Sequence, residues 1–130
     1  MPLHALGVDT PLHELKAELF KALAHPVRVR ALELLVTGPR AVADMLVETG
    51  MEASHLSQHL SVLRRSGLVT AQREGNTVTY RLAHPEVANL LTVARAVLLQ
   101  ALGTSTEALT ALLHQDDEQQ RLDQQNDGTP

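Results

Sequence analysis

Short polar side chains gather on one face of a predicted helix over residues 52–66. Leu56, Leu60 and Leu63 recur at spacings of four and three, which predicts that the opposite face is buried. Hydroxyl, amide and imidazole groups can reach base edges in a DNA major groove, and arginines suit the phosphates. The exposed face carries both kinds of group: Ser54, His55, Ser57, Gln58, His59, Ser61, Arg64 and Arg65.

A predicted β-hairpin follows this helix. Residues 68–73 and 77–82 alternate in polarity, contain β-branched side chains and are joined through a Gly-Asn turn. Arg73, Asn76 and Thr77 lie at its tip, where they can touch the sugar-phosphate backbone beside the helix. A polar helix face alone is also typical of ordinary solvated surface. The hairpin and the short helix upstream favour binding to double-stranded DNA instead.

The remaining elements must position these side chains. Apolar residues at helical spacing, bounded by Pro and Gly, predict helices over about 11–23, 26–37, 40–48 and 84–102. Residues 49–51 form a predicted tight turn between the short third helix and the polar helix. The order α-α-α-α-β-β-α is a winged helix-turn-helix, mainly α with a small β-hairpin.

A chain of 130 residues predicts a single folded domain. We expect residues 1–10 to be a flexible N-terminus and residues 11–103 to be the DNA-binding and dimerisation domain. Residues 104–114 are consistent with a helical extension. Residues 115–130 are rich in Gln, Asp and Asn, which predicts a disordered acidic tail.

Charge and composition exclude several classes of protein. The net charge of −4 is concentrated in residues 116–130, which sum to −4, whereas residues 54–81 sum to +3. Without cysteine there is no disulfide or thiolate metal site. No apolar run is long enough to cross a bilayer, and the N-terminus lacks a signal-peptide pattern, so we expect a cytoplasmic protein. No phosphate loop or nucleophile motif is present, so we do not expect an enzyme.

Three segments resemble the ArsR/SmtB-type repressors. Residues 23–35, LAHPVRVRALELL, are similar to the opening motif of that family. Residues 54–69, SHLSQHLSVLRRSGLV, resemble its recognition helix, and residues 73–82, REGNTVTYRL, resemble its wing. The likeness spans about residues 12–102. It implies a dimer formed by the first and last helices, and a repressor that a ligand releases from its operator.

The sequence itself agrees with a homodimer. The predicted last helix is apolar around more of its circumference than one packing face requires. Packing within a monomer is the alternative explanation. The expected interface residues are apolar positions of the first and last helices: Leu12, Leu15, Leu19, Leu90, Val97 and Leu98.

The ligand that would release the repressor is left open. The family's Cys-Val-Cys metal motif is matched by Ala41-Val42-Ala43, so that site is lost. A second family site, for zinc, is matched at only two of four positions, by His84 and Glu86 but not by Val97 or Gln100. We therefore predict no metal and no cofactor, with a small-molecule inducer still open. A zinc sensor with another His/Glu site and a winged-helix protein-interaction module are the alternatives.

Overall fold

The computed structural model describes residue 7, residues 9–103 and residues 106–127. Two compact units make up the chain, Met1–Ala88 and Asn89–Pro130, and the boundary falls inside one helix. The predicted flexible N-terminus falls largely on residues 1–6 and 8, which lie outside the described residues.

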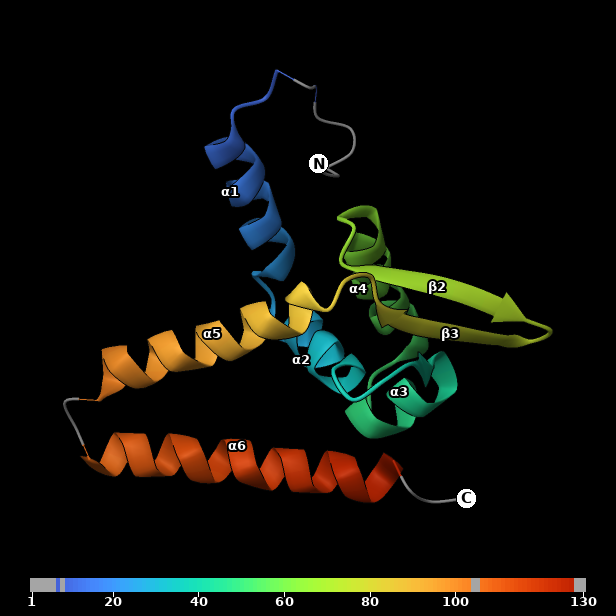
Figure 1. The fold of residues 1–130 in the computed structure, drawn as a ribbon. Helices are drawn as coiled ribbons and strands as arrows, with labels where there is room; N and C mark the ends of the chain where they lie inside the picture. Colours follow the sequence, from blue (N-terminus) through green and yellow to red (C-terminus); the bar gives the residue numbers. More distant parts are fainter. Residues whose placement is uncertain (1–6, 8, 104–105, 128–130) are drawn as a thin grey trace. The chain divides into compact units, whose positions relative to one another are not determined.

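Unit 1 is a helical domain with a small sheet. Figure 1 shows its hairpin projecting from the helices. The elements in chain order are α1 (Leu12–Leu23), α2 (Pro26–Leu35), β1 (Arg40–Ala41), α3 (Val42–Thr49), α4 (Ala53–Arg65), β2 (Val69–Glu74), β3 (Thr77–Leu82) and the start of α5 (Glu86–Leu102). The predicted winged helix-turn-helix order is confirmed.

Side chains define the junction between α1 and α2. His25 is the N-cap of α2, where its Nδ1 accepts a hydrogen bond from the backbone N–H of Val27 at 3.1 Å, and Pro26 fills the first helical position. The guanidinium of Arg28 reaches back and donates to the carbonyls of Lys21 and Ala22 at the end of α1. These bonds satisfy backbone groups that each helix end leaves without an internal partner.

Leucine dominates the core of unit 1. Leu32 and Leu35 of α2 are buried, α2 packs against α4, and Met45 of α3 is fully buried. The chain has a single Phe and a single Tyr, so aliphatic side chains fill the interior. Each fully buried Leu contributes about 1.5–3 kcal/mol of transfer free energy.

The sheet has three antiparallel strands in the order β1-β3-β2. The hairpin runs in register from Val69 opposite Leu82 to Glu74 opposite Thr77. Gly75 in its turn has φ of +62°, a conformation that glycine adopts without strain.

Strand β1 corrects the sequence-based prediction. Residues 40–41 were assigned to the start of the third helix, but they pair with β3, where Arg40 lies opposite Tyr80. Helix α3 therefore begins at Val42. A two-residue strand is too short to show an alternating pattern, so its pairing depends on a partner strand far along the chain.

A buried ion pair joins this strand to α3. The Arg40 side chain is 6% exposed and the Glu48 side chain 5%, and Arg40 Nη1 donates a hydrogen bond to Glu48 Oε1. Arg40 Nη2 also donates to Thr37 Oγ1 at 3.1 Å. The pair thus ties the end of α2, β1 and α3 together.

Unit 2 contains the rest of α5 and a second helix, α6 (Thr106–Asp127). This differs from the predicted disordered tail over residues 115–130, since the helix continues to Asp127. Between residues 106 and 127 the sequence has no Gly or Pro and is rich in Leu and Gln, which are good helix formers. The end of the predicted tail, residues 128–130, lies outside the described residues.

Candidate nucleic-acid interface

The DNA-facing helix predicted from the sequence is α4. Its apolar face is buried, with Leu56 and Leu63 fully inaccessible and Leu60 nearly so. Six of the predicted contact residues on this helix are exposed: Ser54, His55, Ser57, Gln58, Arg64 and Arg65. The Ser54 hydroxyl donates to Glu52 Oε1 at 2.9 Å, which fixes its direction at the start of the helix.

A tight turn sets the angle between α3 and α4. Gly50 ends α3 with φ of +66°, and its N–H donates to the carbonyl of Leu46. Thr49 Oγ1 donates to the carbonyl of Met45 at 2.7 Å and accepts from the N–H of Met51 at 3.3 Å. The predicted turn over residues 49–51 is therefore closed by local hydrogen bonds.

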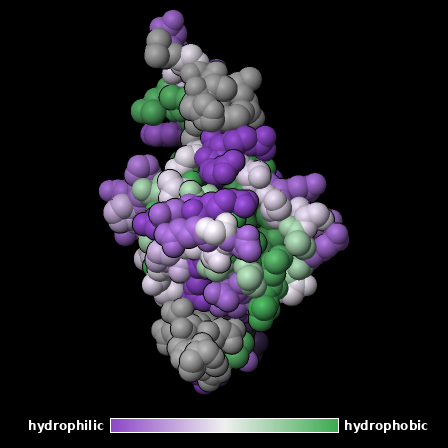
Figure 2. Space-filling model, turned by 90° about the vertical axis from the view of Figure 1, so that its right-hand side faces the viewer, coloured by the Kyte–Doolittle hydropathy of each residue, from purple (hydrophilic) through white to green (hydrophobic). Residues whose placement is uncertain are grey.

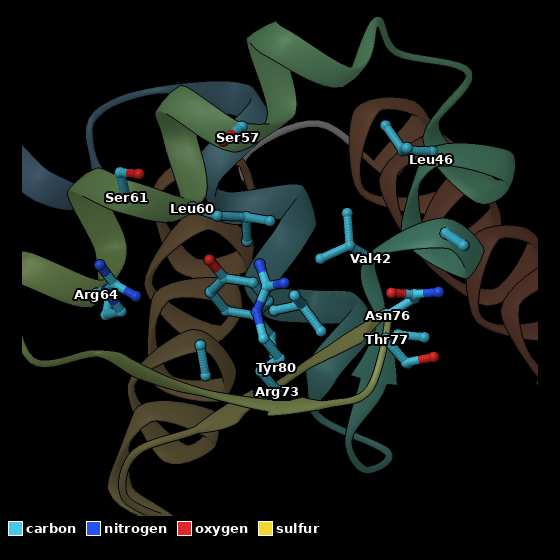
Figure 3. Close-up of a pocket in the computed structure, with 14 residues that line it drawn as sticks. Val42, Leu46, Ser57, Leu60, Ser61, Arg64, Arg73, Asn76, Thr77 and Tyr80 are labelled. Carbon is cyan, nitrogen blue, oxygen red and sulfur yellow. The ribbon is translucent and has the colours of Figure 1, made fainter.

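A groove of about 680 Å³ lies between α3, α4 and the hairpin. Val42, Leu46 and Tyr80 contribute its apolar lining. Six of the predicted DNA-contacting residues line it, three from α4 and three from the hairpin, as Figure 3 shows: Ser57, Ser61, Arg64, Arg73, Asn76 and Thr77.

The groove carries positive charge on both sides. Arg64 comes from α4 and Arg73 from β2, and both side chains are exposed. Figure 2, a view from the side on which the hairpin projects, shows hydrophilic side chains across the middle of this face. Two cations flanking a polar groove can hold the backbone of a nucleic acid strand.

Not every arginine of the hairpin belongs to the groove. Alternation along the strands puts Arg73 and Tyr80 on one face of the sheet and Arg81 on the other. Arg81 donates to Gln72 Oε1 at 3.1 Å, and Gln72 in turn donates to Glu74 Oε1 at 3.3 Å. The positive charge that the sequence placed over residues 54–81 is thus divided between two faces.

His59 has a different environment from the other predicted contacts. It is half-buried, and its ring lies on that of His25 with centroids 4.1 Å apart and planes at 39°. Burial lowers the pKa of His59, and the nearby charges of His25, Arg28 and His55 lower it further. We therefore leave His59 out of the DNA-contacting set. Arg65 is exposed on α4 and lies outside the groove lining.

The predicted dimer residues lie on α1 and α5. Leu12, Val97 and Leu98 are exposed, whereas Leu15, Leu19 and Leu90 are half-buried. Three large apolar side chains that the sequence prediction omitted are also exposed on these helices: Phe20, Val93 and Leu102. Phe20 lies two turns after Leu12, a spacing that could have identified it.

No site for a metal or for membrane insertion is evident in the described part of the chain. Among residues 7, 9–103 and 106–127, no three His, Cys, Asp or Glu side chains are grouped so that they could hold a metal ion. In the same ranges, no helix is both long and apolar enough to span a bilayer.

A helix-turn-helix followed by a basic hairpin and a polar groove defines a winged DNA-binding domain. The family model for the bacterial regulatory proteins of the arsR family matches residues 25–71. The HTH-type transcriptional regulator Rv0081 of Mycobacterium tuberculosis is 52% identical over 103 residues, which cover 78% of this chain and 90% of that protein. The chain therefore belongs to the ArsR family and is a DNA-binding transcriptional regulator rather than an enzyme.

Solved structures agree with this assignment. The crystal structure of Rv0081 superposes with a TM-score of 0.68 at 52% identity, covering 74% of this chain and 97% of that one. The solution structure of the homodimeric winged helix-turn-helix DNA-binding domain of Mb0332 from Mycobacterium bovis gives a TM-score of 0.62 at 35% identity. It covers 72% of this chain and 90% of that one.

Proposed function

We propose that this regulator represses transcription by binding an inverted-repeat operator as a homodimer. The observation that carries the proposal is the groove between α4 and the hairpin, with serine hydroxyls along one wall and Arg64 and Arg73 on both sides. A relative of similar length, the biofilm growth-associated repressor of Agrobacterium fabrum, is 33% identical over 100 residues, which cover 74% of this chain and 86% of that protein.

We assign different tasks to the two walls of this groove. Helix α4 enters the major groove, where Ser57 and Gln58 read base edges. Arg64 and Arg73 hold the phosphate backbone that passes between α4 and the hairpin, and Asn76 and Thr77 at the hairpin tip contact the adjacent sugar-phosphate.

The homodimer is proposed to form through α1 and α5. Their exposed apolar side chains, including Phe20 and Leu98, would be covered by the same helices of a second copy. A twofold dimer requires two inverted half-sites about one helical turn apart, or a multiple of that distance. We place the protein in the cytoplasm, because a bacterial DNA-binding regulator must have access to the chromosome. Because the chain has no cysteine, an inducer cannot act by binding to or oxidising a thiol. An organic ligand is the inducer that we propose.

Selection of bound DNA from a random pool tests the proposal and yields the operator. Gln58→Ala should then weaken operator binding by about 1–3 kcal/mol and relax the sequence preference. Arg73→Ala should weaken binding to all sequences and reduce the salt slope by about one unit. Arg81→Ala is the matched control, because it removes the same charge from the other face of the hairpin.

Two results would contradict the proposal. Equal effects of Arg73→Ala and Arg81→Ala would show that the groove does not hold the phosphates. Failure to enrich any sequence, with binding that ignores salt concentration, would favour the protein-interaction module instead.

A further inference from the structure

Two imidazole rings join α2 to the recognition helix α4. His25 lies at the first turn of α2 and His59 at the middle of α4, and their ring centroids are 4.1 Å apart. Helices α2 and α4 pack against each other in the core of unit 1. The ring contact therefore lies where the position of α4 relative to the rest of the domain is set.

The hydrogen bond at His25 requires a neutral ring. Its Nδ1 accepts from the N–H of Val27, so that nitrogen carries no proton and Nε2 carries the single ring proton. If Nδ1 carried a proton, two donors, this N–H and the backbone N–H of Val27, would face each other and the hydrogen bond would be lost. Protonation would also place a cation at the N-terminus of α2, where the helix dipole disfavours positive charge.

The surroundings of His59 also oppose positive charge. His25 and Arg28 face it from α2, and His55 lies one turn earlier on its own helix. Helix α1 packs against both α2 and α4, and there the carbonyls of Lys21 and Ala22 bind Arg28, while the Lys21 ammonium pairs with Glu18. A proton on His59 would therefore place a new positive charge beside that of Arg28, and this charge would be repelled.

We propose that His25 and His59 form a proton-sensitive clamp on the recognition helix, which holds α4 in its DNA-binding position only while both rings are neutral. Operator binding then weakens on acidification. The operator readout rests on the proposed function, whereas the clamp itself can be tested without DNA.

The direction of the effect distinguishes the clamp from ordinary electrostatics. Acidification adds positive charge to a protein, which by itself tightens binding to a polyanion. In the clamp, both rings stay neutral while α4 is in its DNA-binding position. When the ring contact opens, the rings can take up protons, and α4 is no longer held in that position. Each excluded proton weakens binding about tenfold per pH unit below the relevant pKa values.

The experiment measures the operator dissociation constant of the full chain at pH 7.5 and pH 5.5, at fixed salt. The ratio of the two values is compared among variants, so that each protein is its own reference. We expect the parent to bind operator more weakly at pH 5.5, by up to about tenfold for each ring that takes up a proton. His59→Phe keeps a ring in the stack, and His25→Asn keeps a capping acceptor, and neither titrates in this range. Each should reduce the acid weakening, because the ring that it replaces no longer excludes a proton, whereas His84→Gln, at an exposed histidine outside the cluster, should retain it in full.

A second arm follows the free energy of unfolding at the same pH values without DNA. Because the pKa of folded His59 lies below its ordinary value of 6.5, the unfolded chain binds more protons below that pH. Stability of the parent should therefore fall as the pH decreases below about 6.5, and the fall should be smaller in His59→Phe.

The two arms separate the two hypotheses. If the parent selects no operator at pH 7.5 but its stability shows the expected difference from His59→Phe, the proposed function is wrong, and only the exclusion of protons by the His25–His59 contact stands. If parent and His59→Phe lose stability equally on acidification, or if the parent binds operator more tightly at pH 5.5, the clamp is refuted.

Discussion

Removing one member of the buried Arg40–Glu48 pair should destabilise unit 1 strongly. Glu48→Ala removes the carboxylate that pairs with a guanidinium only 6% exposed. Breaking a buried ion pair in this way costs about 3–5 kcal/mol, out of a total of about 5–15 kcal/mol for a typical domain. The variant should therefore lose about a fifth of its stability or more, because a buried guanidinium loses its ion-pair partner.

Urea denaturation followed by circular dichroism measures this loss as a shift of the midpoint at constant slope. The double variant Arg40→Met with Glu48→Leu should recover most of the lost stability, because well-packed apolar side chains replace a buried pair at little cost. Lys21→Ala is the control, since Lys21 forms an exposed pair with Glu18. A loss below about 1 kcal/mol for Glu48→Ala would refute the reasoning, as would a double variant no more stable than the single one.

Three further changes test other parts of the fold. Gly50→Ala should cost about 1–2 kcal/mol and lower the melting temperature, because φ is +66° and the added Cβ meets no atom within 4 Å that could compensate. Arg28→Met should cost about 1–3 kcal/mol in urea denaturation by removing the donors to the carbonyls of Lys21 and Ala22, and Arg28→Lys should recover part of this. Leu98→Glu should place an unpaired carboxylate in the proposed dimer interface, so that the variant sediments as a monomer and binds operator poorly. A parent protein that sediments as a monomer at micromolar concentration would contradict the proposed interface.

Local signals made the recognition helix and the hairpin predictable from the sequence. The leucines of α4 recur at helical spacing, and the bounding glycines Gly50 and Gly67 both have positive φ. The two residues of strand β1 show no periodic pattern, because only their pairing with β3 defines them as a strand.

The half-buried position of His59 was partly predictable from its spacing along α4, although this residue was assigned to the exposed face. It lies three residues after Leu56 and four before Leu63, at the edge of the apolar stripe. A residue there is more often half-buried than projecting into solvent. Its contact with His25, in contrast, joins residues 34 positions apart, and no periodicity within one helix could reveal it.

Helix α6 shows the limit of an argument from composition. A polar segment with few apolar side chains cannot build a core, which is why a disordered tail was predicted. Helix formation requires only that the backbone bonds close within the segment, and no Gly or Pro interrupts residues 106–127. Composition thus excluded a packed domain and did not exclude a helix.

The single tyrosine of the chain lies where the groove, the sheet and the buried ion pair meet. Tyr80 is 8% exposed, lines the groove and pairs with Arg40 across the sheet, and the chain contains no tryptophan. Intrinsic fluorescence of this protein therefore comes from one ring in one known environment. Coincidence of its unfolding transition with the loss of helical circular dichroism would show that the groove opens only when the whole unit unfolds.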